Sequence, residues 1–162
     1  MSAGASQQTL GALQRAMAQR FAQANVVTPM LDARVLVCAA ARLSPEQLIM
    51  KENEQIRPHD LNCLQIWAAA RCAGMPVSRL TGRRAFYGLD FDIGPAVLDP
   101  RADTETLVEA ALELMPARAR VLDLGTGSGC VLISVLARAL DARGLGVDIS
   151  AGALRLARQN AH

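Results

Sequence analysis

The sequence predicts two folded parts of different class: a small helical bundle and, after a β-hairpin linker, the first half of a doubly wound α/β domain. Apolar residues recur at helical spacing up to about residue 75. An aromatic segment that contains glycine follows, which is typical of a hairpin. Beyond residue 100, short apolar runs alternate with helical runs, as in parallel strands joined by crossover helices. We therefore expect a helical domain at residues 1–75, a linker at 76–100 and an α/β part at 101–162.

Composition and charge exclude several function classes. Of the 162 residues 51% are hydrophobic and 20% are charged, which is enough apolar material for a core and no signature of disorder. The net charge is only +2 and the basic residues are scattered, so nothing predicts direct DNA binding. No apolar stretch reaches the ~18 residues that a membrane span needs, and no signal peptide is recognisable. We expect a cytoplasmic protein that does not associate with membranes.

The four cysteines do not predict a metal site. They form no C-x-x-C pair and have no histidine at a ligand spacing, so we expect reduced thiols and no bound metal. They are Cys38, Cys63, Cys72 and Cys130.

Four helices are expected in the first part. The first has apolar residues at three- and four-residue spacings on one face, and Ser44 with Pro45 predicts the start of the third. The expected helices span residues 9–24, 31–41, 44–50 and 59–73. Gly74-Met75-Pro76 then ends the helical pattern.

The linker is expected to be a β-hairpin. Phe86, Phe91 and Ile93 flank a Gly88-Leu89-Asp90 turn. These aromatic residues predict either a packing junction between two domains or the wall of a ligand pocket.

The α/β part is expected to begin with a helix that Asp103 or Thr104 caps and that runs to about Met115, with Leu107, Ala111 and Leu114 on one face. The stretch "RVLDLG" predicts a strand buried on both faces. A helix over "CVLISVLARAL", a buried strand over "GLGVDIS" and a helix over "AGALRLARQNA" follow.

A glycine-rich turn is the strongest functional signal. Gly125, Gly127 and Gly129 lie where a strand turns into a helix, directly after Asp123, and glycine lets the backbone turn tightly and approach a ligand. Nineteen residues beyond Gly129, at the end of the next strand, Asp148 stands where an acid accepts hydrogen bonds from ribose hydroxyls. The pair predicts an adenosine-containing ligand.

The detail of the turn distinguishes between nucleosides. A dinucleotide fingerprint has glycine at its sixth position, where this chain has Cys130, and no Gly-Lys-Ser/Thr of a phosphate-binding loop follows. The Asp-x-Gly-x-Gly-x-Gly spacing instead resembles motif I of methyltransferases that use S-adenosylmethionine, whose ligand has no pyrophosphate. A nicotinamide- or flavin-binding domain and a catalytically empty fold are the alternatives.

Three stretches are similar to the HemK/PrmC family: "GRRAFYGLDFDIGPAVLDPRADTETLVEAAL", "VLDLGTGSGC" and "GVDISAGALRLARQNA". That family methylates the side-chain amide of glutamine in peptide chain release factors, within their Gly-Gly-Gln loop. It joins a helical N-terminal domain through a hairpin to a Rossmann-like class I methyltransferase domain. The resemblance runs from about Thr9 and is strongest from Gly82 onward.

The resemblance implies roles for individual residues. The helical domain would help to recognise the release factor, and Asp148 would hold the ribose of S-adenosylmethionine. The methionine and ribose end of the cofactor would be lined by Gly125, Thr126, Gly127, Ser128 and Gly129. Near the cofactor, by the same resemblance, would lie Phe86, Arg101, Thr104 and Glu105.

The chain departs from the family pattern in two places. It has Asp99-Pro100-Arg101-Ala102 where the family usually has Ile-Pro-Arg-Pro, which is tolerable if Asp99 is exposed. It also ends at His162 after two strands, before the Asn-Pro-Pro-Tyr motif that binds the glutamine amide in the family. No residue is therefore identifiable as catalytic, and we expect the 162-residue chain to be inactive on its own. A non-catalytic module that binds a release factor or the ribosome is the rival function.

Overall fold

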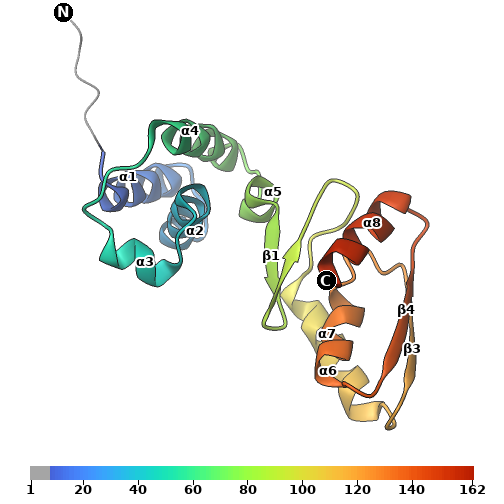
Figure 1. Ribbon diagram of the computed structural model, residues 1–162. Coiled ribbons are helices and arrows are strands. Elements are labelled where there is room, and N and C mark those ends of the chain that lie inside the picture. The colour runs from blue at the N-terminus through green and yellow to red at the C-terminus, as the bar shows by residue number, and fades with distance from the viewer. Residues whose placement is uncertain (1–7) are drawn as a thin grey trace, which may run out of the picture. The chain divides into compact units, whose positions relative to one another are not determined.

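The computed structural model describes residues 8–162, which form two compact units (Figure 1). The first unit extends to Thr81 and the second runs from Gly82 to His162. The sequence divides the chain into three parts, at residues 75 and 100, whereas the structure places the hairpin within the second unit.

The first unit is helical throughout its described part. Its helices are α1 (Leu10–Gln23), α2 (Pro29–Ala41), α3 (Pro45–Met50), α4 (Pro58–Cys72) and α5 (Val77–Thr81). The first four lie where the sequence predicts them. The short α5 is a correction, because helical structure resumes directly after Pro76, whose carbonyl accepts the N–H groups of Arg79 and Leu80. Five residues are too few to produce a recognisable helical period.

Side-chain caps explain where two of these helices begin. The Thr9 hydroxyl accepts the N–H of Ala12 at 3.3 Å, at the start of α1. Ser44 caps α3 as predicted, and its partner in a reciprocal capping box is Gln47. These bonds satisfy N–H groups that have no acceptor within the helix.

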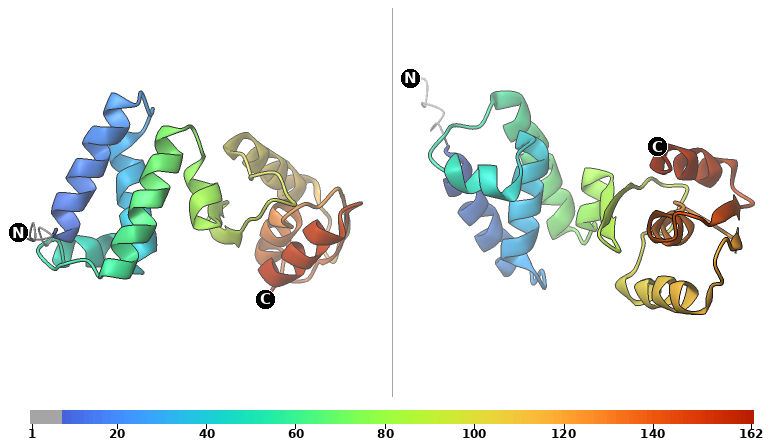
Figure 2. Two further views of the ribbon diagram at one scale, coloured as in Figure 1. Left: turned by 90° about the horizontal axis from the view of Figure 1, so that it is seen from above. Right: turned by 60° about the horizontal axis from the view of Figure 1, so that its bottom comes forward.

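The core of the first unit lies between α1, α2 and α4, the three long helices that pack against one another in Figure 2. Phe21 from α1, Leu36 and Val37 from α2, and Leu64 from α4 are fully buried there. The apolar stripe predicted for α1 therefore does face a core.

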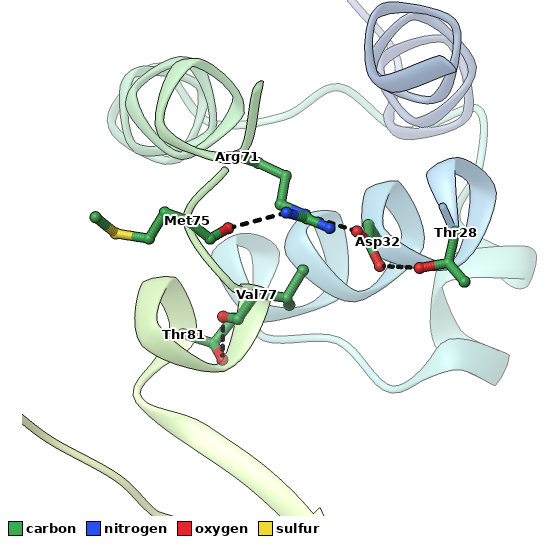
Figure 3. Close-up of polar contacts among 6 residues, drawn as sticks. All are labelled: Thr28, Asp32, Arg71, Met75, Val77 and Thr81. Carbon is green, nitrogen blue, oxygen red and sulfur yellow. Dashed lines mark hydrogen bonds and ion pairs between the residues drawn. The ribbon is translucent and has the colours of Figure 1, made fainter. Parts of the chain in front are cut away.

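A buried ion pair joins α2 to α4 (Figure 3). The Nε of Arg71 lies 2.7 Å from Oδ2 of Asp32, whose side chain is 9% exposed. The other carboxylate oxygen accepts the Thr28 hydroxyl at 2.8 Å, and Arg71 also donates to the carbonyl of Met75 at 3.3 Å. This network fixes the end of α4 and the turn that follows it.

The second unit begins with an antiparallel hairpin of β1 (Arg83–Phe86) and β2 (Leu89–Asp92). Its turn is Tyr87-Gly88, with φ of 50° and 75°, and not the predicted Gly88-Leu89-Asp90. Positive φ at both central residues matches the twist of the two strands, but it is rare for an aromatic residue, so the sequence does not reveal it.

A helical segment joins the hairpin to the sheet. A 3₁₀ turn, η1 (Ala102–Thr104), precedes α6 (Glu105–Leu114), and the Thr104 side chain makes no capping bond. The fully buried residue of α6 is Val108. Of the three residues predicted to share one face, Ala111 packs against the same core cluster, whereas Leu107 and Leu114 are exposed. The predicted helix is therefore present, and its inner face is only partly the predicted one.

Two parallel strands follow, each succeeded by a helix. They are β3 (Arg120–Leu124), α7 (Cys130–Arg138), β4 (Arg143–Val147) and α8 (Ala151–Asn160). The register pairs Leu122 with Leu145 and Leu124 with Val147. Helix α7 packs against the sheet through Val135, which is buried with Val121 in one cluster.

One face of this sheet is not covered by any other element of the second unit. Leu122 is 58% exposed and Leu124 is 74% exposed, so the expectation of strands buried on both faces is wrong for the described chain. None of the helices among the described residues combines the length and the hydropathy that a membrane span requires.

Candidate cofactor site

The glycine turn connects the end of β3 to the first turn of α7. Gly125, Gly127 and Gly129 have φ of 77°, 56° and 81°. Residues with a side chain rarely adopt this left-handed region, and this explains why a glycine stands at every second position.

The backbone of the turn is hydrogen-bonded to the end of β4. The N–H groups of Gly125 and Thr126 both donate to the carbonyl of Val147, at 2.8 and 2.9 Å. The N–H of Gly127 donates to Oδ2 of Asp148 at 2.9 Å. The glycine turn is therefore held directly against the end of β4 and Asp148.

Asp148 lies between the glycine turn and the first turn of α8. Its Oδ1 accepts the N–H of Ser150 at 2.8 Å, and its Oδ2 accepts that of Gly127. These two bonds, that from Ser150 first, lower the pKa of Asp148, so it is ionised at neutral pH. Each carboxylate oxygen has a second lone pair, and the half-buried side chain can accept two further donors.

Thr126 is the other polar side chain anchored in the turn. Its hydroxyl donates to Oδ2 of Asp123 at 2.7 Å, which fixes the turn to the end of β3. Gly146 on β4 makes room for it, because an added Cβ would lie 2.8 Å from the Thr126 hydroxyl oxygen. Sequence reasoning did not single out Gly146.

A cavity of about 470 Å³ lies beside the turn. Thr126 and Asp148 lie on its wall, and most of the remaining wall is apolar, with Leu132, Leu154 and Ala157 among its residues. Its size falls within the range of small-molecule sites, which are mainly apolar with few polar groups.

The structure shows no hydrogen bond between the glycine turn and the four residues of the hairpin and the following segment that the resemblance places near the cofactor. Phe86 is 2% exposed and packs edge-on against Phe91, with ring centroids 6.2 Å apart. The Glu105 carboxylate accepts the N–H of Tyr87 at 2.9 Å. Arg101 is exposed, and Thr104 is the residue before α6. Their proximity to a cofactor stays a prediction.

Asn160, at the end of α8, is a residue of the site that sequence reasoning missed. Its side-chain amide donates to the carbonyl of Ser128 at 2.9 Å and also bonds the backbone of Asp92. An asparagine at a helix end carries no sequence signal for such distant partners.

Two other expectations concern charge and thiols. Asp99 is half-buried rather than exposed. Burial raises the pKa of the Cys130 thiol, the most buried of the four cysteines. Among residues 8–162 there is no group of three or more histidine, cysteine or acidic side chains that could hold a metal ion.

Comparison with known proteins finds a matching family model for the first unit and similar relatives that span both units. Residues 12–82 match the PrmC N-terminal domain. The chain is 43% identical over 153 residues to a release factor glutamine methyltransferase of Rhodospirillum rubrum, a match that covers 94% of this chain and 47% of the relative. A protein of the same name from Burkholderia pseudomallei is 44% identical over 133 residues, covering 81% and 47%. A third, from Nitratidesulfovibrio vulgaris, is 37% identical over 160 residues, covering 98% and 54%.

The resemblance of the chain to the HemK/PrmC family is confirmed by these matches. The chain spans about half the length of the curated relatives it matches. The match to the Nitratidesulfovibrio vulgaris protein includes the glycine turn and Asp148, since it covers 98% of this chain.

Proposed function

We propose that this chain contributes the N-terminal domain and the first part of the cofactor site of an S-adenosylmethionine-dependent release factor glutamine methyltransferase. The second unit is then the first half of a doubly wound, class I domain. The observation that carries the proposal is the ionised Asp148 bonded to the glycine turn at the carboxyl ends of two parallel strands, where such folds bind ligands. The names of the relatives supply the reaction.

The hydrogen bonds of the turn support a nucleoside without pyrophosphate. Four of its five N–H groups, those of Gly125, Thr126, Gly127 and Gly129, donate within the protein. A pyrophosphate cradle needs N–H groups that point at the ligand. This favours S-adenosylmethionine over a nicotinamide or flavin dinucleotide.

In the proposed reaction this chain binds and orients, and we assign no catalytic residue to it. Bound S-adenosylmethionine supplies a methyl group on a sulfonium. Asp148 accepts hydrogen bonds from its ribose, while Thr126 and the turn hold the adjacent backbone in one conformation. Alignment of reactants of this kind can supply ~7–11 kcal/mol of a barrier, so holding the cofactor still is itself a contribution to the rate.

The helical unit is proposed to help bind the release factor. Val27, Met30 and Leu31 are 92%, 58% and 48% exposed around the start of α2, and together they present an apolar surface. Clusters of exposed apolar side chains are typical of surfaces that contact other proteins. A module that binds release factors without methylating them has the same surface, so binding alone does not separate the two functions.

The test combines pull-down of a release factor with a methyl-transfer assay, on this chain and on the protein extended to the length of its relatives. We expect both to bind the release factor and only the extended protein to methylate it. Binding by both with no methylation by either would favour the non-catalytic module. Nicotinamide nucleotide bound in preference to S-adenosylmethionine would overturn the cofactor assignment.

A further inference from the structure

The side chain of Asn160 connects three segments of the second unit. Its Nδ2 donates to the carbonyl of Ser128 in the glycine turn at 2.9 Å and to that of Asp92 at the end of β2 at 3.0 Å. Its Oδ1 accepts the N–H of Asp92 at 2.8 Å. Both amide N–H donors and the amide oxygen are therefore used.

These partners lie far from Asn160 in the chain. Ser128 is 32 residues away and Asp92 is 68 residues away. An asparagine that only ends a helix bonds the neighbouring backbone, whereas this side chain leaves α8 for two other elements. The bonds are thus tertiary contacts that hold the hairpin, the turn and α8 together.

Ser128 accepts this bond between two flexible residues of the turn. It stands between Gly127 and Gly129, both in the left-handed region, and glycine loses more conformational freedom on ordering than any other residue. A turn that is already ordered before the ligand arrives binds it more tightly. The free energy of binding is then not reduced by the conformational entropy that the turn would otherwise lose.

We propose that Asn160 is a positioning residue for the cofactor site: it fixes Ser128, and with it the glycine turn, against the end of the hairpin. The inference rests on the proposed function for the identity of the ligand. The inference adds that β2 and the glycine turn are coupled, so that ordering one of these two segments favours order in the other.

Two substitutions separate the bonds of Asn160. Asn160→Ala removes all three. Asn160→Asp keeps an oxygen that can accept the N–H of Asp92 but loses the donors to Ser128 and to the Asp92 carbonyl. Gln159→Ala is the matched control, since Gln159 is an exposed neighbour on the same helix.

The first measurement is amide hydrogen exchange on the extended protein without ligand. We expect Asn160→Ala to speed exchange at Asp92 and at Gly127 and Gly129, with Gln159→Ala unchanged. Asn160→Asp should speed exchange in the turn while leaving Asp92 protected. Unchanged exchange at Gly127 and Gly129 in both Asn160 variants would overturn the proposal, because Asn160 would then only hold the hairpin.

The second measurement is titration of the extended protein with S-adenosylmethionine. We expect Asn160→Ala and Asn160→Asp to weaken binding about three- to tenfold, the equivalent of a lost hydrogen bond, with the KM for the release factor unchanged. Equal affinity in all variants would overturn the positioning role. If the unsubstituted protein does not bind S-adenosylmethionine, the proposed function fails, while the exchange experiment still decides the role of Asn160 in ordering the turn.

Discussion

Asp148 is the single side chain on which the nucleoside assignment depends. The carboxylate accepts the N–H groups of Gly127 and Ser150, and each of its oxygens has a further lone pair that can accept a hydrogen bond from a ligand. Its lowered pKa means that it carries a full charge at neutral pH. A charged acceptor makes a stronger hydrogen bond to a hydroxyl than a neutral one does.

We expect Asp148→Ala to weaken binding of S-adenosylmethionine several-fold or more in the extended protein, measured by calorimetry. Asp141→Ala is the matched control, because Asp141 also accepts a backbone N–H, that of Arg118 at 2.9 Å, outside the turn. If Asp148→Ala binds as tightly as Asp141→Ala, the ribose assignment is wrong.

Gly127 is a residue of the turn where backbone conformation, and not lack of space, disfavours a side chain. A Cβ there would meet only the Gly125 carbonyl oxygen, at 3.9 Å, so the surrounding protein leaves room for it. Its φ of 56° is the obstacle, because a β-branched side chain is strained in that region.

In the extended protein we expect Gly127→Val to abolish binding of S-adenosylmethionine and to leave the circular-dichroism spectrum nearly unchanged. The strain falls on the turn, and the new side chain takes up space where the backbone would approach the ligand. Gly94→Val is the control, since a Cβ at Gly94 meets nothing within 4 Å and its φ is not left-handed. Binding that survives in Gly127→Val would mean that the turn does not hold the cofactor.

At the scale of elements, the sequence predicts well which segments are helices and which are strands. It predicts less well which face of each element points toward the core. Helix α6 is apolar on several sides. Periodicity alone selected Leu107, Ala111 and Leu114, whereas the structure packs Val108 and Ala111 inward and exposes the two leucines. Which face of α6 is buried depends on the surface that the helix packs against, and the residues of that surface lie elsewhere in the chain. The hairpin turn shifted by one residue for a related reason, since Tyr87 adopts a backbone conformation that its residue type does not favour.

The same distinction applies to the candidate site. The placement of the three glycines in a strand-to-helix turn and of Asp148 after the next strand was predictable, because a strand, a turn and an acid at fixed spacing are local features of the chain. Asn160 was not, since its bonds cross 32 and 68 residues. The Arg71–Asp32 pair, separated by 39 residues, is invisible to local patterns in the same way.

The Arg71–Asp32 pair gives a prediction for the packing of α2 against α4. The two side chains are 18% and 9% exposed, so removing one partner leaves the other charge poorly solvated. We expect Asp32→Ala to lower the free energy of unfolding of the helical unit by about 3 kcal/mol, as is typical when one partner of a buried pair is lost. Chemical denaturation followed by helical circular dichroism measures it.

Lys51→Ala is the control for this prediction, because it removes a pair of similar chemistry, Lys51–Glu54, whose side chains are 42% and 60% exposed. Exposed ion pairs contribute about 0–1 kcal/mol to the free energy of unfolding. If Asp32→Ala lowers the free energy of unfolding by no more than Lys51→Ala does, the Arg71–Asp32 pair does not stabilise the packing of the helices.

At the scale of the whole molecule, the two units differ in how completely they bury apolar surface. The first has fully buried residues from three different helices at its centre, among them Phe21, Leu36 and Leu64. The second exposes one face of its parallel sheet, which carries Leu122, Leu124, Leu145 and Val147. Unpaired strand edges and exposed apolar faces favour association between molecules.

The two units should therefore differ in local stability in the 162-residue chain. Protection from hydrogen exchange follows the burial of apolar contacts around each backbone hydrogen bond. We expect protection in α1, α2 and α4 and little in residues 118–162, and no tight binding of S-adenosylmethionine, since a turn on a loosely held strand is not ordered in advance. The measurement is hydrogen exchange together with cofactor titration on the purified chain, at several protein concentrations so that association is seen. A protected β3 with micromolar cofactor affinity would contradict this expectation and would mean that two strands and their helices suffice to hold the site.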